Sequence, residues 1–184
     1  MAAQTVFESR LEPRYAELES LFMQLYDDRG SFAALVEMLR RASRERTQQL
    51  KLLDAQRLRT PDWYCGGAML GMTMYTELFA GGLEGLTRRL DYLAEQGVTY
   101  LHLMPLLKMP HPDNDGGYAV EDFNTVDPSL GTNEQLAALT AAMRRRGMSL
   151  CLDFVINHTA DTHEWARRAR AGEQEYIDRY ITFD

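Results

Sequence analysis

The sequence predicts an α/β protein in which an all-helical segment precedes a parallel β-sheet. Apolar residues recur at spacings of three and four through residues 1 to about 60, which is the period of an amphipathic helix. After residue 61, three short apolar runs of strand length alternate with two segments of helical period. A strand–helix–strand–helix–strand series of this kind implies parallel strands joined by crossover helices.

The helical segment is expected to contain several helices. One apolar stripe has the helical spacing and comprises Tyr15, Leu18, Phe22 and Leu25. Pro13 suits a first helical turn, Gly30 indicates a stop, and Ser31 is expected to cap the helix that follows. Thr60-Pro61 ends the helical region, because a residue before proline avoids the helical conformation.

Two helices are predicted between the three strands. Helical spacing marks residues 83–96 and 132–147, and a glycine closes each segment. Thr132 and Gln135 have the spacing of a capping box, in which each residue's side chain binds the other's backbone N–H. The three strands are expected in "MLGMTMY", "VTYLHLMPLL" and "MSLCLDFVIN".

The third strand carries an unusual residue. Its apolar run, Leu150 to Ile156, predicts a buried strand, yet Asp153 lies inside it and Asn157-His158 closes it. A buried carboxylate is costly unless it has partners, so Asp153 indicates either a core hydrogen-bond network or a functional site. His102 alternates with leucines in the second strand and is expected to be a buried, hydrogen-bonded residue.

A long connection, residues 105–131, follows the second strand and is expected to lack regular structure. Connections of this length inside an α/β unit are usually functional. This connection and Asn157-His158 both leave the carboxyl end of a strand, which is where α/β sheets and barrels place their sites. Both features therefore point to the same edge of the sheet.

The loop segment Asp115-Gly116-Gly117-Tyr118 has two interpretations. The glycines permit backbone geometries that can bring a carboxylate and an aromatic ring into one pocket. Together with His158 these are the parts of a sugar site, because carboxylates accept bonds from hydroxyls and rings cover the C–H face of a pyranose. The alternative is a plain turn capped by Asp115 with a packed Tyr118, and the residues alone leave both open.

Composition and motifs exclude several classes of partner. The net charge of −7 argues against nucleic acid or an anionic membrane as the main partner. No apolar run reaches the ~18–20 residues of a membrane span, and the N-terminal stretch does not resemble a signal peptide, so a cytoplasmic location is expected. The two cysteines form no disulfide or zinc pattern, and no glycine-rich phosphate cradle follows a strand.

Taken together, these segments resemble the α-amylase superfamily of glycoside hydrolases, and within it the amylosucrases. "LDFVINHT" resembles the superfamily signature Asp-x-x-x-Asn-His at the end of barrel strand three, and "DNDGGYAVEDFNTVDPSLGT" resembles the amylosucrase form of the strand-two loop. The resemblance implies an N-terminal helical domain (1–60), the first three β/α units of an incomplete (β/α)8 TIM barrel (61–158) and the start of an inserted domain (159–184).

The resemblance also assigns roles to residues. It implies that His158 hydrogen-bonds the glucosyl unit at subsite −1, that Tyr118 stacks on that ring, and that Asp115 pairs with a distant arginine at the pocket floor. Asp153 and Asn157 are expected to support the surrounding loops. The family's nucleophilic aspartate, acid/base glutamate and stabilising aspartate lie on strands four, five and seven, so catalytic residues are expected beyond Asp184. Neither a metal nor a cofactor is expected.

The resemblance therefore implies the N-terminal part of an enzyme that cleaves sucrose, releases fructose and passes glucose to an α-1,4-glucan through a covalent glucosyl intermediate. The partners are then sucrose and a glucan acceptor, and the 184-residue chain alone is expected to be inactive. Within the superfamily, a sucrose hydrolase, a trehalose synthase or another α-glucosidase are alternatives. A non-catalytic interaction module and a small complete α/β binding domain are alternatives of other classes.

Overall fold

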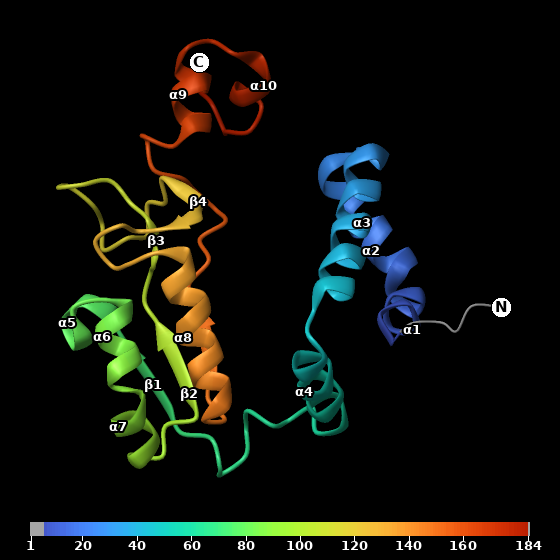
Figure 1. The fold of residues 1–184 in the computed structure, drawn as a ribbon. Helices are drawn as coiled ribbons and strands as arrows, with labels where there is room; N and C mark the ends of the chain where they lie inside the picture. Colours follow the sequence, from blue (N-terminus) through green and yellow to red (C-terminus); the bar gives the residue numbers. More distant parts are fainter. Residues whose placement is uncertain (1–5, 184) are drawn as a thin grey trace. The chain divides into compact units, whose positions relative to one another are not determined.

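The computed structural model describes residues 6–183, which divide into one unit up to Trp63 and a second from Tyr64 onward (Figure 1). Residues 1–5 and Asp184 lie outside the described residues. Residues 1–5 belong to the N-terminal stretch from which the absence of a signal peptide was predicted. Within residues 6–183, every helix is too short or too polar to cross a membrane.

The first unit consists of helices. These are α1 (Val6–Leu11), the 3-10 turn η1 (Glu12–Arg14), α2 (Tyr15–Tyr26), α3 (Arg29–Glu45) and α4 (Gln48–Arg59). Its small core centres on Phe32, which is 3% exposed and meets the ring of Phe22 at a centroid distance of 5.5 Å. The predicted stripe on α2 reaches this core only in part, since Leu25 is 76% exposed.

The start of α3 differs from the prediction. Asp28 caps this helix, because its carboxylate accepts hydrogen bonds from the N–H groups of Gly30 (2.8 Å) and Ser31 (3.2 Å). Gly30 and Ser31 therefore lie inside the first turn, and the predictions of a stop and a cap at these residues were wrong. An aspartate accepts such bonds as readily as a serine, so the sequence offered two caps three residues apart.

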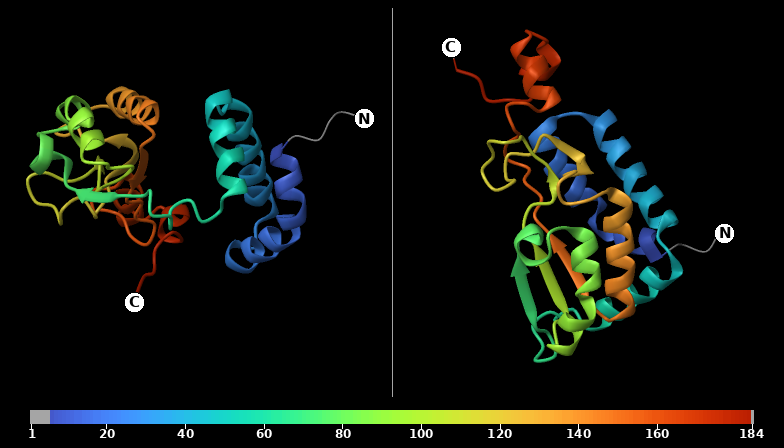
Figure 2. Two further views of the ribbon diagram at one scale, coloured as in Figure 1. Left: turned by 90° about the horizontal axis from the view of Figure 1, so that it is seen from below. Right: turned by 60° about the vertical axis from the view of Figure 1, so that its left-hand side comes forward.

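The second unit is built on a parallel sheet of three strands in the order β1 (Gly71–Met74), β2 (Tyr100–Leu103) and β5 (Ser149–Leu152). The parallel arrangement is the one that the sequence predicts. Helices cover one face of this sheet, as Figure 2 shows in its right-hand view. They are α5 (Thr76–Ala80), α6 (Leu83–Arg88), α7 (Leu90–Glu95) and α8 (Asn133–Arg145).

The core lies between these helices and the sheet. Its fully buried leucines include Leu86, Leu93, Leu101, Leu103 and Leu139. The capping box of α8 is confirmed, since Thr132 Oγ1 accepts from Gln135 N at 3.2 Å and Gln135 Oε1 accepts from Thr132 N at 3.0 Å. The helix predicted over residues 83–96 is interrupted at Arg89, which separates α6 from α7.

The third strand is shorter than predicted. β5 ends at Leu152, and the prediction of a buried strand continuing to Ile156 was wrong: Phe154 is 65% exposed and Ile156 is 80% exposed. β5 pairs with β2 on one side and stands at the edge of the three-stranded sheet. Without a second neighbouring strand the ladder does not continue, and Phe154 instead meets the ring of Phe123 on one side, at a centroid distance of 5.6 Å.

The connection after β2 is more ordered than predicted. It contains an antiparallel pair, β3 (Leu107–Lys108) and β4 (Asp122–Val126), so the expectation of a structureless loop was wrong. Pairing satisfies backbone groups that an irregular segment would leave open. The carboxylate of Asp127 lies at the base of this connection and is 0% exposed.

Asp127 binds both arms of the connection. Its Oδ2 accepts from Met109 N (3.2 Å) and from His111 Nε2 (3.0 Å), and its Oδ1 accepts from Ser129 N (2.9 Å). Burial raises the pKa of the Asp127 carboxyl, but the hydrogen bonds from Ser129, His111 and Met109 more than offset burial and hold that pKa below its usual range.

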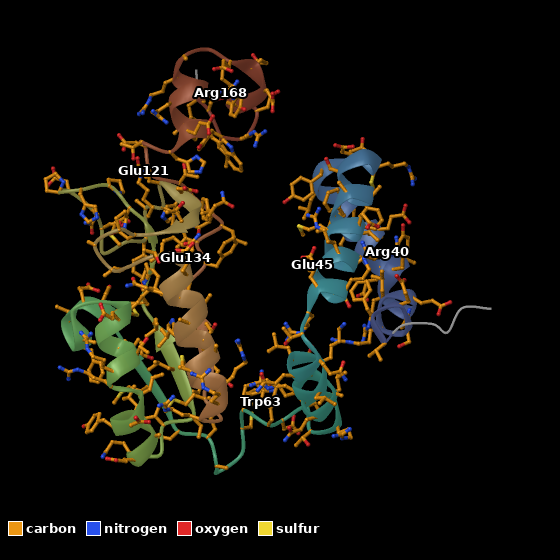
Figure 3. The ribbon with its side chains drawn as sticks, viewed as in Figure 1. Arg40, Glu45, Trp63, Glu121, Glu134 and Arg168 are labelled. Atoms are coloured by element: carbon orange, nitrogen blue, oxygen red, sulfur yellow. The ribbon has the colours of Figure 1, made fainter. Side chains whose placement is uncertain are left out.

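The described chain closes with a helical hairpin, α9 (Glu164–Arg170) and α10 (Gln174–Ile177). Arg168, labelled in Figure 3, joins its two arms. Its Nε donates to the Glu173 carboxylate at 2.9 and 3.0 Å, and its guanidinium lies 3.9 Å from the centre of the Tyr176 ring. The hairpin is thus held by a bidentate ion pair and a cation–π contact.

Replacing Asp127 by alanine is predicted to lower the free energy of unfolding by about 3 kcal/mol, because it leaves several buried donors without an acceptor. Urea denaturation measures this loss. Asp113→Ala, at an exposed position in the same connection, is the matched control and should change stability by less than about 0.5 kcal/mol.

The pH dependence adds a second check. The pKa of Asp127 is lowered in the folded state, so the stability contributed by its charge is present above the unfolded value near 3.8 and is lost as the pH falls through the folded-state value. The charge-dependent part of the difference between Asp127→Ala and the unmodified chain should therefore shrink only below about pH 4. A constant difference down to pH 2 would argue against a buried carboxylate.

Candidate functional site

The candidate site lies at the carboxyl ends of the three parallel strands, on the face away from the helices. Register places Thr73, His102 and Cys151 side by side across the sheet. The neighbouring residues of β2, Leu101 and Leu103, are fully buried in the core beneath the helices. Because side chains alternate between faces, the row that contains His102 belongs to the opposite face.

A hydrogen-bonded chain crosses this face. His102 Nε2 lies 2.9 Å from Asp153 Oδ1, and Tyr118 Oη donates to Asp153 Oδ2 at 3.3 Å. Thr73 Oγ1 lies 3.4 Å from His102 Nδ1 at the other end of the chain. One carboxylate thus links β2, the segment after β5 and the connection that carries Tyr118.

His158 is attached to the same tyrosine. Its Nε2 lies 3.1 Å from the backbone carbonyl oxygen of Tyr118, and its Nδ1 lies 2.9 Å from Asn157 Nδ2. Nδ1 accepts the amide proton and Nε2 donates, which assigns the neutral tautomer with its proton on Nε2. Asn157 therefore sets which nitrogen of His158 faces the loop.

Asp115 has a local role in this structure. Its Oδ1 accepts from Ala119 N at 2.8 Å, so it caps the turn that Tyr118 ends. This is the plain turn that the sequence left open as an alternative. Its side chain is exposed, and its hydrogen bond to Ala119 runs within the turn, not to His158 or Asp153. The structure joins Tyr118, His158, Asp153 and Asn157, and Asp115 lies beside them on the same turn.

The two glycines of the turn have different surroundings. Both have a positive φ, +84° at Gly116 and +89° at Gly117. A β-carbon at Gly117 would lie 2.9 Å from Pro105 Cβ and 3.1 Å from Met109 Cε, so the backbone packs against the stem of the connection. Gly117 is required both for its conformation and for this close approach.

Electrostatics favour a neutral Tyr118. Burial raises the pKa of the Tyr118 phenol, and the nearby Asp153 carboxylate raises it further by disfavouring a second negative charge. Tyr118 consequently stays protonated and serves as a hydrogen-bond donor to Asp153 across the physiological range.

An open groove of about 1070 Å³ borders the site. His158 and Asn157 line it together with aromatic side chains from β4 and the C-terminal hairpin region, including Phe123, Trp165 and Tyr180. The ring of Trp165 is already covered by the Arg179 guanidinium, 4.4 Å from its centre. The groove lining does not include Tyr118, Asp115 or Asp153.

Sequence reasoning missed the contribution of two residues. His102 was expected to be buried and hydrogen-bonded, and its bond is confirmed, but its side chain is 29% exposed and binds Asp153 of the site. Its position between two core leucines was the signal that it faces the other side of the sheet. For Asp127 the signal was the Asp-Pro-Ser sequence, in which an aspartate binds the backbone two residues on.

The described residues contain no group of three or more His, Cys, Asp or Glu side chains that could hold a metal ion. The pair formed by His111 and Asp127 is a structural contact at the base of the connection.

Gly117→Ala is predicted to destabilise the second unit by about 2–3 kcal/mol, from positive-φ strain together with the clash against Pro105. Gly172→Ala is the matched control, because Gly172 has a similar φ of +87° but open space around the added carbon. It should cost only about 1 kcal/mol. Equal losses of stability in the two variants, measured by urea denaturation, would show that the close packing at Gly117 is unimportant.

Asp153→Asn is predicted to lower the pKa of Tyr118, because the substitution removes the negative charge that opposes phenolate formation. The measurement is an NMR pH titration with [13Cζ]tyrosine, in which Tyr118→Phe identifies the Tyr118 signal. Asp122→Asn, on β4, should leave that pKa unchanged. An unchanged pKa in Asp153→Asn would exclude the proposed carboxylate–phenol contact.

Comparison with known proteins now gives the family. Residues 40–184 match the family described as "Alpha amylase, catalytic domain". Maltase 1 of Drosophila virilis is 38% identical over 104 residues, which are 56% of this chain and 16% of that protein. The trehalose synthase/amylase of Mycolicibacterium smegmatis is 41% identical over 105 residues, 56% of this chain and 17% of that protein. The amino acid transporter heavy chain of Rattus norvegicus is 34% identical over 127 residues, 65% of this chain and 18% of that protein.

Solved structures give the same result. The trehalulose synthase of Pseudomonas mesoacidophila aligns with a TM-score of 0.56 at 32% identity, covering 62% of this chain and 22% of that one. The trehalose-6-phosphate hydrolase of Bacillus licheniformis aligns with a TM-score of 0.58 at 27% identity, covering 65% and 22%. The chain spans 16% to 18% of the length of the three curated relatives named above. With the family match extending over residues 40–184, the chain belongs to the α-amylase catalytic domain family of glycoside hydrolases.

Proposed function

We propose that these residues form the N-terminal part of a retaining enzyme that transfers a glucosyl unit from sucrose to the non-reducing end of an α-1,4-glucan. The observation that carries the proposal is the attachment of His158 to Tyr118, with 3.1 Å between His158 Nε2 and the Tyr118 carbonyl oxygen. It gathers an aromatic ring and an imidazole, forty positions apart in sequence, at the carboxyl ends of parallel strands. Barrel enzymes bind their substrates at that end.

In this proposal the ring of Tyr118 covers the C–H face of one glucosyl unit. The Nε2–H of His158, which donates to the Tyr118 carbonyl oxygen in this structure, turns to donate to a sugar hydroxyl when the unit binds. Asp115 closes the pocket floor together with an arginine from another part of the protein. Asp153 and Asn157 hold Tyr118 and His158 in place through the bonds described above. A pocket with room for only one sugar ring accepts a terminal glucosyl unit. It therefore selects donors in which the glucosyl unit carries no further sugar at its non-reducing end.

Retention of configuration requires two carboxyl groups about 5–5.5 Å apart. One attacks the anomeric carbon while the other protonates the departing fructose oxygen; the first then holds glucose as a covalent ester. The second carboxylate next accepts the proton of a glucan hydroxyl, which attacks the anomeric carbon and releases the enzyme. We propose that residues 61–158 hold the first three units of a larger (β/α)8 barrel, that these two carboxyl groups and the remaining strands lie beyond Asp184, and that the reaction uses no cofactor.

Sucrose is proposed as donor because the Asp-Gly-Gly-Tyr-Ala-Val loop and the helical first unit resemble the amylosucrases together. The relatives favour a second candidate: two of them are a maltase and a trehalose synthase/amylase, so an enzyme acting on another α-glucoside fits the same site. The relative that is an amino acid transporter heavy chain favours a third, non-catalytic role. Membership of the family alone does not establish catalysis.

The test uses the full-length product of the gene that encodes these residues. Sucrose, maltose and trehalose are supplied separately, each with and without an α-1,4-glucan, and released sugars and glucan length are measured. Fructose release from sucrose with glucan elongation supports the proposal. Turnover of maltose or trehalose without sucrose turnover replaces it with the second candidate, and inactivity on all three sugars supports the third.

His158→Ala in the same protein is predicted to lower kcat/KM for the cleaved sugar by about 100-fold, because a polar contact to the reacting ring is lost. Asp113→Ala, an exposed position near the Gly-Gly turn, is the matched control and should leave kcat/KM within about twofold. Equal kinetics for His158→Ala and the control would remove His158 from the site.

A further inference from the structure

We propose that His102 is a positioning residue that fixes the Tyr118 ring through the carboxylate of Asp153. The inference rests on the proposed function in one respect, the use of that ring as a platform for sugar. The contacts themselves do not depend on it: His102 Nε2 to Asp153 Oδ1 is 2.9 Å, and Tyr118 Oη to Asp153 Oδ2 is 3.3 Å.

The two contacts use different oxygens of one carboxylate. Asp153 follows the last residue of β5, where sheet pairing no longer restrains the backbone. Its side chain is 23% exposed, so packing alone does not hold it. The short bond from His102 therefore sets the direction of the carboxylate, and the longer bond to Tyr118 follows from that direction.

His102 is itself well anchored. It lies in the central strand of the three, between Leu101 and Leu103, both fully buried. Thr73, its register neighbour on β1, places a hydroxyl 3.4 Å from Nδ1. A neutral imidazole with its proton on Nε2 donates to Asp153 and can accept from Thr73, so one tautomer satisfies both contacts.

The orientation of Asp153 affects the Tyr118 ring through the hydroxyl of that tyrosine. The backbone of Tyr118 is restrained by His158, while its side chain is restrained at the far end by Asp153. The two restraints, at the backbone and at the hydroxyl, fix the direction of the long axis of the side chain. Loss of the Asp153 contact leaves the hydroxyl with the Tyr75 side chain and the Met104 sulfur as its neighbours. The axis of the ring can then shift, which weakens stacking without removing any group that touches the sugar.

Two variants that both carry a side-chain amide, but differ in length, test whether a donor must reach Asp153. The amide of His102→Gln can place an N–H donor near the position of Nε2, whereas the amide of His102→Asn ends too short to reach Asp153. We expect the 13Cζ signal of Tyr118 in the 184-residue chain to remain near its original position in His102→Gln and to shift in His102→Asn. His102→Leu should shift it as well. If the leucine variant does not fold, the comparison of His102→Gln with His102→Asn still tests the positioning role.

Kinetics of the full-length enzyme provide the second readout. His102→Asn should raise KM for the glucoside about three- to tenfold with kcat within about twofold, because stacking contributes to ground-state and transition-state binding alike. His102→Gln should restore KM. In a Tyr118→Phe background, which already lacks the hydroxyl, His102→Asn should add little further change.

The outcomes distinguish the two proposals. A Tyr118 signal that is unaffected by His102→Asn overturns the positioning role. A shifted signal with unchanged KM retains the positioning role and overturns the use of the ring as a sugar platform. Equal increases of KM in His102→Asn and His102→Gln, or full additivity with Tyr118→Phe, would show that His102 acts by another route.

Discussion

The buried carboxylate of Asp127 is the constraint on which the candidate site depends. A charge removed from water is costly unless donors surround it, and Asp127 meets that requirement with donors from Met109 and His111 on one arm of the connection and from Ser129 on the other. The requirement to solvate one carboxylate therefore closes the base of the connection. Between the two arms, the Gly-Gly turn packs against the stem at Pro105.

Asp153 has a different function because its partners are distant. The donors to the Asp127 side chain lie at most 18 positions away in sequence, whereas Asp153 bonds to residues 51 and 35 positions away. Asp127 thus shapes the connection from within, and Asp153 attaches the shaped connection to the sheet. The position of the Tyr118 ring requires both, since a rigid loop without the Asp153 contact would hold the Tyr118 backbone beside His158 but would leave the phenol end of the ring unattached to the sheet.

The difference in range also explains what the sequence could predict. The capping box at Thr132 and Gln135 depends on three positions of one helix, and the parallel sheet follows from local periods and the order of elements. The end of β5 could not be read this way, because an apolar run has the same pattern whether or not another strand covers it. The bond between His102 and Asp153 was invisible for the same reason: it depends on which strands are neighbours.

Asp115 shows how a residue can fit two interpretations at once. Its bond to Ala119 N is that of a plain turn cap, yet it holds the turn that carries Tyr118. A capping bond occupies one oxygen of a carboxylate that has about four lone-pair positions, so capping and contact with a further cation are compatible. The bond to Ala119 explains the conformation of the turn. The proposed role at the pocket floor concerns the other oxygen of the same carboxylate.

The family relationship determines how far these contacts can be extended to chemistry. Relatives of the chain include a maltase, a trehalose synthase/amylase and an amino acid transporter heavy chain, so a shared scaffold accompanies different roles. In this chain, three parallel strands and a clamped connection position a ring and an imidazole, and such a scaffold alone does not fix the chemistry. Retaining glycoside chemistry needs a pair of carboxylates that face the sugar, so catalysis depends on residues other than Tyr118, His158, Asp153 and His102. The contacts among these four residues hold the ring and the imidazole in place. Under the proposed function, that arrangement decides where a glucosyl unit binds, and the carboxylates that face the unit decide its chemistry.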